Sequence, residues 1–371
     1  MLPSLNFLEK RHPMNHNLIF YPHYANLTIT QKSLYDLLLD KIIKAEKKIS
    51  VDIDCKIEDV NAVVDAIYND RPALYWFTGI GTTYHCNGKV NSFEPKYNSL
   101  VNDIPKHNAA IKKVISKYFA AMPSDNILKQ ELYFHDLLSR EITYLHGSND
   151  QNIYSAFIEK KSVCAGYTRA FQFIMNQLGI PCYYCSGLGK SDTKKDDTWE
   201  RHAWNIVKLG PDYYNVDLTW DDHYGEKSSK SNHISYKYYN CTDSFISKTH
   251  KRDAEMLFLP KCNGTKYSFK NVTGIPYELR RVYDDGVSCK TLVTDSNTYH
   301  SVVTGLLKKS KGKSLAFSFP VNNTEIINNS NVLFRKAVDA VYGQSIGWHM
   351  SSLSTDYKNG YYKLKYEFTI K

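Results

Sequence analysis

The sequence predicts an α+β protein, in which a helix that carries a cysteine packs on an antiparallel sheet between two small α/β modules. Three observations predict this fold. Apolar residues recur at helical spacing from 165 to 178, two alternating segments follow between 202 and 219, and both ends of the chain show a strand, a helix and a hairpin in that order. A length of 371 residues allows two or three domains, which we place at 1–104, 105–270 and 271–371.

The first module is expected to contain two helices, a short strand and a hairpin. A lysine-bearing helix from Ser33 leads into a strand at Ile49–Ile53, and a second helix covers Asp59–Asn69. The segment Ala73–Phe77 is typical of a strand, and a loop and an Asn87-Gly88 turn follow it. Because Asn-Gly is a strong signal for a two-residue turn, we expect the strands on either side of this loop and turn to form a hairpin.

Two helices lead into the central core. After a linker at Pro105, they cover Asn108–Met122 and Asn126–Tyr144, and the second has an apolar stripe that suits packing on a core. His135 lies on this second helix. We interpret it as a partly buried histidine with satisfied hydrogen bonds, because no catalytic group accompanies it.

Cys164 is the first residue of the core that suggests chemistry. The apolar positions after it recur every three or four residues and end at Gly179, which is typical of a one-faced helix with a glycine C-cap. Cys164 therefore lies in the first turn, and Ser162 can supply the N-cap oxygen. Unpaired N–H groups and the helix dipole at such a position favour the thiolate, which is the nucleophilic form of a cysteine.

A histidine and an aspartate follow on two strands. His202 heads an alternating segment that continues to Val207, and a Gly-Pro-Asp turn leads to a second strand at Tyr213–Thr219. Asp217 lies on that second strand, so the hairpin brings a carboxylate beside an imidazole. A carboxylate that orients a histidine, which activates a thiol, makes a cysteine nucleophile site. The sequence therefore predicts a triad of Cys164, His202 and Asp217.

Four stretches of the core carry a family resemblance: VCAGYTRAF, the LGIPC after it, HAWN and YNVDLTWDD. They resemble the transglutaminase-like superfamily of papain-like thiol enzymes, in particular its bacterial branch related to cytokinesis and kyphoscoliosis-type proteins. The resemblance covers about residues 105–270 and implies Cys164 as nucleophile, His202 as general base and Asp217 as orienting carboxylate. Ala165 departs from this branch, which commonly has an acidic residue there; the departure concerns the rim of the cleft and leaves the triad intact.

The triad implies acyl transfer through a thioester, without a cofactor. His202 takes the proton of Cys164, and the thiolate attacks a carboxamide or peptide carbonyl. The backbone N–H of Cys164 contributes to the oxyanion hole, and Tyr154, at a position where relatives often have tyrosine, is our candidate for the second donor. We expect Trp204 and Trp220 to wall the substrate cleft and exclude water.

Three functions remain open at this point. Hydrolysis by a protease or amidase is slightly favoured over transamidation, which cross-links proteins, because the sequence lacks the calcium-loop pattern of regulated cross-linkers. A catalytically silent scaffold would instead bind a peptide or a cell-wall polymer through its flanking modules. A thiol-redox protein would use Cys182 and Cys185. The intact set of Cys, His and Asp favours the enzyme.

The C-terminal module shows the same order of elements as the first. Leu315–Phe319 is expected to be a strand and Val332–Tyr342 a helix, and Ile346–Met350 is expected to pair across a turn at Asn359-Gly360 with Tyr362–Thr369. The stretches DAIYNDRPALYWF and DAVYGQSIGWHM are alike. We interpret the two modules as copies of one unit, and convergent patterning is the alternative.

Composition and charge exclude several classes of protein. With 42% hydrophobic and 23% charged residues, the chain is that of a globular rather than a disordered protein. The net charge of +9 is spread over short clusters without a basic stripe that includes aromatic residues, which argues against nucleic-acid binding. We expect a protein or peptide substrate, for which association with the cell wall is one option. The oligomeric state is open.

The eight cysteines are scattered, which fits reduced thiols better than disulfides. Cys182 and Cys185 form a lone CxxC in a strand, so we interpret them as structural. We expect no metal site, because His223 and His233 with Asp221-Asp222 match no ligand spacing. No signal pattern or membrane span is present, so the expected location is the cytoplasm for a complete sequence, or the cell surface or exterior if a signal was removed.

Overall fold

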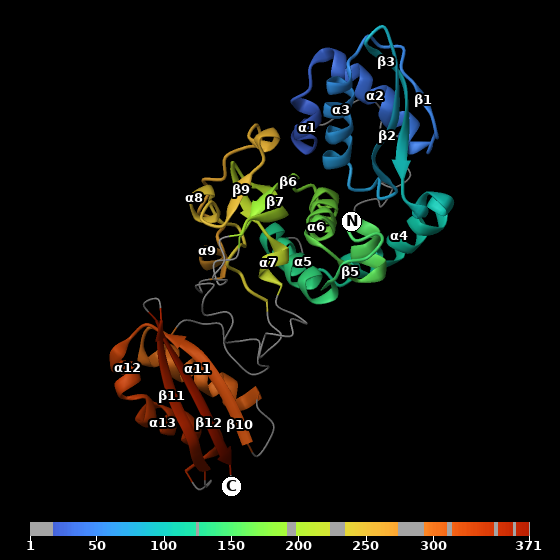
Figure 1. Cartoon of the computed structure of the whole chain (residues 1–371). Helices are drawn as coiled ribbons and strands as arrows, with labels where there is room; N and C mark the ends of the chain where they lie inside the picture. The colour runs from blue at the N-terminus through green and yellow to red at the C-terminus, as the bar shows by residue number, and fades with distance from the viewer. Residues whose placement is uncertain are drawn as a thin grey trace. The chain divides into compact units, whose positions relative to one another are not determined.

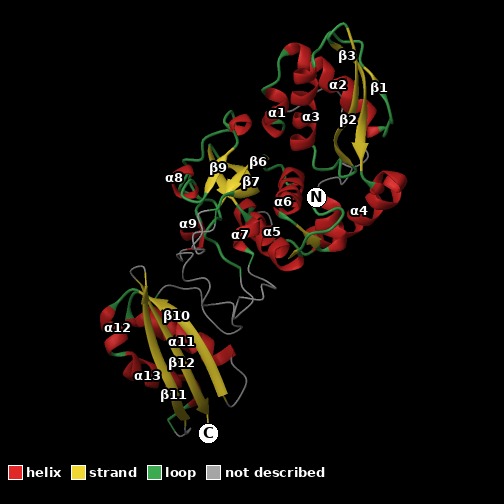
Figure 2. Cartoon of the chain, viewed as in Figure 1, coloured by secondary structure: helices red, strands yellow, loops and turns green. Residues whose placement is uncertain are grey.

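The protein is an α+β chain that divides into two compact units (Figures 1 and 2). The first unit contains residues up to 225 together with 238–265, and the second contains 226–237 and 266–371. A computed structural model describes residues 18–123, 126–190, 198–222, 234–273, 293–309, 314–344, 348–358 and 361–370. The first unit contains the predicted first module and most of the predicted core, whose residues 226–237 and 266–270 belong to the second unit.

The first module consists of helices and a three-stranded antiparallel sheet of order β1-β3-β2. Its elements are η2 (Leu18–Phe20), α1 (Pro22–Ala25), α2 (Ile29–Ile43), β1 (Ile49–Ser50), α3 (Ile57–Asp70), β2 (Phe77–Cys86) and β3 (Lys89–Tyr97). Thr28 and Gln31 form a capping box that starts α2. Apolar side chains of α2, α3 and the sheet are buried in its core: Leu34, Leu38, Ile42, Ile49, Val60, Val63, Ile67, Val90 and Phe93.

The β2–β3 hairpin confirms the predicted Asn-Gly turn and corrects the first strand. Asn87 and Gly88 have φ angles of 52° and 77°, which a two-residue hairpin turn of this kind requires. However, β2 begins at Phe77, whereas we predicted a strand at Ala73–Phe77 and then a loop. Most of β2 is polar and exposed. It therefore lacks the buried alternation on which a strand prediction depends.

The core follows in the same unit. Its elements are η3 (Ser99–Asp103), α4 (Ile104–Ala120), α5 (Ile127–Glu141), β4 (Thr143–Tyr144), η4 (Ser155–Glu159), β5 (Lys161–Ser162), α6 (Cys164–Gln177), β6 (Cys182–Gly189), β7 (Glu200–Leu209), β8 (Asp212–Val216), α7 (Leu218–Asp221), α8 (Asp243–Ile246), β9 (His250–Arg252) and η5 (Ala254–Met256). Pro105, which we took as a linker, lies in the first turn of α4, where its missing N–H costs nothing.

The main sheet of the core is antiparallel, with strand order β8-β7-β6-β9. Helix α6 packs against β6 and β7, and α5 packs against α6 (Figure 1). Nearly every residue of α6 is buried, and Gly179 ends it with a φ angle of 77°. The predicted arrangement, a cysteine-bearing helix on an antiparallel sheet, is confirmed.

The second unit has its own core and its own three-stranded antiparallel sheet, of order β10-β12-β11. Its elements are α9 (Phe269–Thr273), α11 (Ser296–Lys309), β10 (Ser314–Val321), α12 (Thr324–Asn328), α13 (Ser330–Tyr342), β11 (Trp348–Lys358) and β12 (Tyr361–Ile370). The predicted pairing with Tyr362–Thr369 is present, as β11 with β12. Ile346 and the Asn359-Gly360 turn lie outside the described residues.

The two small modules share a strand order. In each, a first strand is followed by a hairpin, and the last strand of the hairpin lies in the middle of the sheet. A helix precedes the first strand in both, and a helix separates it from the hairpin. This common order agrees with duplication of one unit, which stays a prediction. Among the described residues, no helix is both long and apolar enough to cross a membrane.

Candidate active site

Cys164 is the first residue of α6 and is half-buried. Ser162 does not cap this helix, contrary to our prediction; the N-cap is Val163, which makes no side-chain cap. The Ser162 hydroxyl instead donates to the backbone oxygen of Asp150 at 2.7 Å and shares a hydrogen bond of 2.8 Å with the Ser155 hydroxyl. Ser162 thereby holds the segment before α6 through residues that precede the helix, whereas a cap would bond the first N–H groups of the helix itself.

Gly166 allows this tight entry into α6. A Cβ atom at this position would lie 1.8 Å from the Ser162 hydroxyl oxygen and 2.9 Å from the backbone oxygen of Asp150. No side chain fits there without movement of the entering segment. The glycine two residues after Cys164 is therefore a packing requirement of the site.

The β7–β8 hairpin brings His202 and Asp217 together, although Asp217 lies just beyond β8 and not on the strand that we predicted. His202 is near the start of β7, and its Nε2 is 2.8 Å from Oδ2 of Asp217. Asp217 follows directly after β8. The predicted strand Tyr213–Thr219 is too long, because Oδ1 of Asp217 accepts the N–H groups of Thr219 and Trp220 and so caps α7.

A second histidine, which the sequence analysis missed, contacts the same carboxylate. Nε2 of His250, on β9, is 3.0 Å from Oδ2 of Asp217. An ionised carboxylate only accepts hydrogen bonds, so both histidines donate to it through Nε2. The other ring nitrogen of His202, Nδ1, is therefore left to act on the thiol. His250 lies 33 residues after Asp217 on a three-residue strand, and no motif of the sequence marks it.

The charges of the site favour a protonated His202. Burial lowers the pKa of His202, but the charge and hydrogen bond of Asp217, together with a hydrogen bond to Cys164, raise it to about 10. Burial raises the pKa of Asp217, but the two histidines lower it well below its usual value. Burial also lowers the pKa of His250, despite its bond to Asp217. His202 is thus the imidazole of the pair that most readily carries a proton.

The two predicted wall residues occupy different places. The Trp220 ring lies 5.0 Å from the His202 ring and is half-buried. The Trp204 ring stacks 6.3 Å from His202, but it is only 1% exposed and donates to Oδ1 of Asn215. Trp220 therefore contacts the histidine from a partly exposed position, whereas Trp204 contacts it from within the buried core.

Of two tyrosines near the start of α6, the predicted one is turned toward other aromatic rings. The Tyr154 ring packs 6.1 Å from Tyr75 and 4.9 Å from His107, and its role in an oxyanion hole stays a prediction. Tyr144, on β4, is half-exposed. Burial raises the pKa of the Tyr144 hydroxyl to about 12, and the charges of Cys164, Glu200 and Asp217 add to this rise.

Buried hydrogen bonds hold the elements around the triad. His135 is fully buried, rather than partly buried as predicted, and binds Asp221 through Nε2 at 3.3 Å. The Tyr167 hydroxyl donates to Asp222 at 2.7 Å. These contacts occupy the carboxylates of Asp221 and Asp222, which the sequence analysis considered as metal ligands together with His223 and His233. The two histidines lie outside the described residues.

Two further sets of groups bear on cofactors. In the described part of the chain, His202, Asp217 and His250 are the one set with metal-ligand atoms close together, within 4.8 Å. Direct hydrogen bonds between the three already account for that spacing. Cys182 and Cys185 are buried free thiols on β6, and burial raises the pKa of both, in the case of Cys185 to about 12. Protonated, buried thiols suit packing and not redox exchange.

A cavity of about 690 Å³ lies between the core sheet and the first module, and Cys164, His202 and Asp217 are not among the residues that line it. Its wall includes Tyr184, which packs with Ala165, Ala203 and Cys164. Arg201, next to His202, also lines it and forms two hydrogen bonds with Asp253. The opposite wall comes from α1 and α3 of the first module. The first module therefore contributes to a cavity whose wall includes Tyr184, a neighbour of Cys164.

A thiol at the start of a helix, a strand histidine and a carboxylate hydrogen-bonded to that histidine form the arrangement that papain-like thiol enzymes use. Residues 115–218 match the model of the Transglutaminase-like superfamily, which identifies this segment as a transglutaminase-like domain. Members of that superfamily are generally Cys-His-Asp thiol enzymes, and inactive members also occur. No curated protein matches the chain.

The chain also resembles solved structures, one of which is described as "Crystal structure of a TGase". The two sequences are 14% identical and the TM-score is 0.25. The similarity covers 46% of this chain and 50% of the solved chain, so this chain spans half the length of that protein.

Proposed function

We propose that this protein is a cysteine acyl-transfer enzyme that uses Cys164, His202 and Asp217 on peptide or glutamine-type amide bonds. The observation that supports this best is the line of contacts from the Cys164 thiol through the His202 ring to Oδ2 of Asp217. The thiol gives its proton to His202, and the thiolate attacks the carbonyl carbon. The C–N bond then breaks as His202 returns the proton to the leaving amine, which leaves a thioester.

The surroundings of the thiol supply the rest of the reaction. The developing oxyanion is stabilised by the backbone N–H of Cys164 at the start of α6, with a tyrosine hydroxyl from Tyr144 or Tyr154 as the second donor. Asp217 keeps the imidazolium of His202 in place throughout. The triad itself needs no metal or cofactor for these steps.

Hydrolysis of the thioester by water remains slightly favoured over transfer to an amine. The half-exposed position of Cys164 leaves the thioester open to water, which favours the hydrolytic outcome. The 690 Å³ cavity is large enough for several side chains of a peptide substrate, which is the partner we propose. The alternative, a silent scaffold, would keep the cavity and leave the thiol unreactive.

Site-resolved alkylation by iodoacetamide against pH tests the proposal, read by mass spectrometry in wild type and His202→Ala. We expect Cys164 to be labelled faster than Cys86 at neutral pH, although Cys86 is the more exposed thiol. His202→Ala should remove this advantage. The buried Cys182 and Cys185 serve as unreactive controls in the same spectrum.

Equal labelling of Cys164 and Cys86 would contradict the enzyme and favour the scaffold. If Cys164 is reactive, release of ammonia or of a peptide fragment without amine incorporation identifies a hydrolase. Incorporation of a fluorescent primary amine into a glutamine peptide identifies a transamidase instead. Cys164→Ser is the control that should abolish either product.

A further inference from the structure

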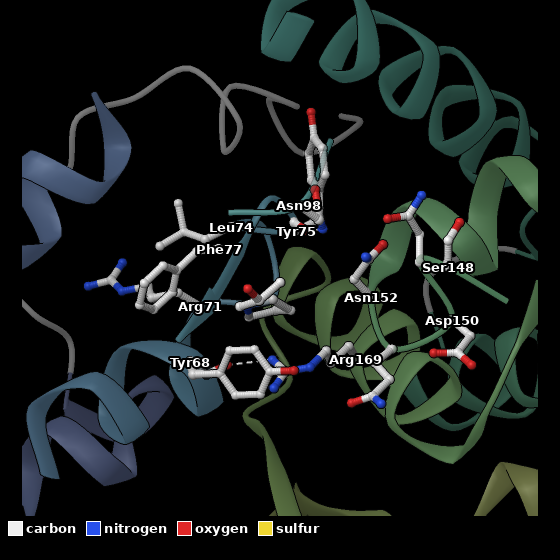
Figure 3. Close-up of a pocket in the computed structure, with 14 residues that line it drawn as sticks. Tyr68, Arg71, Leu74, Tyr75, Phe77, Asn98, Ser148, Asp150, Asn152 and Arg169 are labelled. Carbon is white, nitrogen blue, oxygen red and sulfur yellow. Dashed lines mark hydrogen bonds between the residues drawn. The ribbon is translucent and has the colours of Figure 1, made fainter. Parts of the chain in front are cut away.

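A second cavity of about 220 Å³ lies in the first unit behind the start of α6 (Figure 3). The segment 148–152 forms one wall, and Tyr68 of α3 and Tyr75 with Asn98 of the first module form the other. Arg169 of α6 lines it, and Figure 3 shows this side chain extending toward the Tyr68 ring. The triad residues do not line this cavity.

Arg169 is buried without a full set of partners. Its side chain is 3% exposed, and its guanidinium lies 3.7 Å from the Tyr68 ring centre and 4.5 Å from that of Tyr184. Nη1 donates to the backbone oxygen of Tyr68. Nε and Nη2 are buried and have no hydrogen-bond partner among the described residues.

A buried guanidinium in this state lacks its usual compensation. Removing a charge from water costs several kcal/mol unless hydrogen bonds and an opposite charge replace the water. Among the described residues, the partners of the Arg169 guanidinium are two tyrosine rings and one backbone oxygen, and none of them is a carboxylate. Asp150 lines the same cavity, but its carboxylate already accepts the N–H of Gly147 at 3.0 Å and contacts His146 at 3.2 Å.

We propose that this cavity binds a small carboxylate, which Arg169 holds through Nε and Nη2. These two N–H groups form the fork that pairs with both oxygens of a carboxylate. A volume of 220 Å³ corresponds to about seven water molecules in the liquid, which suits a single amino acid or the last residue of a peptide. Neutral side chains of Asn98, Ser148 and Asn149 at the wall suit the polar remainder of such a ligand.

The site is connected to the start of α6 by direct bonds. The backbone oxygen of Asp150 accepts the N–H of Val163 at 2.9 Å and the Ser162 hydroxyl, immediately before Cys164. On the other side, Tyr184 contacts both Arg169 and the Cys164 cluster. A carboxylate on Arg169 is therefore positioned to alter the setting of the thiol, as a substrate end or as an effector.

Binding is tested on the full chain with Cys164→Ala, so that the result does not depend on the proposed activity. Saturation-transfer NMR and calorimetry follow titration with N-acetylglycine, with N-acetylglycinamide as the uncharged control. We expect saturable binding of the acid alone. Arg169→Gln should weaken it roughly ten- to hundredfold, the effect of losing a charge-assisted pair. Arg335→Gln, which changes an exposed guanidinium on α13 outside this cavity, should bind as well as the parent.

Asn149→Trp guards against a folding defect in Arg169→Gln, because it fills the cavity from a half-buried position and keeps the arginine. It should abolish binding while circular dichroism stays unchanged. Equal binding by Arg169→Gln, equal binding of the amide, or tighter binding of inorganic phosphate would each overturn the carboxylate site. Comparing glycine with N-acetylglycine then distinguishes a free amino acid from a chain end.

Discussion

Asp217 accepts four hydrogen bonds from groups that come from three different elements. Oδ1 takes the N–H groups of Thr219 and Trp220, and Oδ2 takes His202 and His250. Both oxygens of this buried carboxylate are therefore fixed, and with them the plane of the His202 ring. His250 acts as a positioning residue for His202 through the shared oxygen.

Replacing His250 by Phe keeps an aromatic ring and removes one donor from Asp217. Because His250 contributes to lowering the pKa of Asp217, its loss raises that pKa. We expect the acid-side loss of Cys164 labelling to move to higher pH, with a smaller fall in the neutral rate than in His202→Ala. His85→Phe, an exposed histidine on β2, is the matched control. If the acid side of the labelling profile of Cys164 is unchanged, His250 contributes packing only.

At the residue scale, sequence reasoning located residues that stand in one clear motif. Cys164, His202 and Asp217 stand in such stretches and the structure brings their side chains together, while their roles in catalysis stay a prediction. His250 and Tyr144 lie on strands of two or three residues, which are too short for any period to appear. Ser162 was misplaced because a serine before a helix has several possible partners, and here Asp150 and Ser155 take its hydroxyl.

At the scale of elements, the start of α6 depends on one glycine. Gly166→Ala would place a Cβ 1.8 Å from the Ser162 hydroxyl oxygen. We expect a loss of about 1–3 kcal/mol in the free energy of unfolding, as for other overpacked sites, together with slower labelling of Cys164. Denaturant unfolding and the alkylation assay measure the two effects.

Gly305→Ala in α11 is the control for this substitution. No atom lies within 4 Å of a Cβ at that helical position, so this variant should gain about 0.5–1 kcal/mol. If Gly166→Ala changes neither the free energy of unfolding nor the labelling rate, the segment before Cys164 moves freely. The site would then not depend on this tight entry.

Long elements with a clear period were predicted to within a few residues, and polar or interrupted ones were not. Helices α3, α5 and α13 agree with the expected ranges. Strand β2 was placed too early because it is exposed on both faces, and β8 was extended too far because Asp217 looks like a strand residue until its cap is seen. Tertiary contacts decide both cases.

At the scale of the whole molecule, the first unit contains a buried acid in its core. Glu131 is fully buried on α5, and its Oε2 accepts the Tyr239 hydroxyl and the Asn240 amide. Burial raises the pKa of Glu131 to about 7, despite these bonds and the nearby His135. The folded state therefore keeps this proton over a range in which the unfolded chain has lost it.

The sign of the effect on stability follows from this shift. Since the folded pKa lies above the ordinary value of 4.5, the free energy of unfolding falls as pH rises from 4.5 to 7. Glu131→Gln should flatten this part of the profile and gain on the order of 2 kcal/mol above pH 7. Urea unfolding across pH measures it, with the exposed Glu58→Gln as control. An unchanged profile would mean that another group binds the proton.

The shared strand order of the two small modules has a consequence for how each one assembles. Ile49 pairs with Phe93 and Ser314 pairs with Thr369. In both modules, therefore, the first strand can pair only after the last strand is present. The hairpin strands are neighbours in sequence and close a short loop, whereas capture of the first strand closes a long one. We therefore expect each hairpin to form before its sheet is complete, so that during synthesis on the ribosome neither module can close until its final strand has emerged.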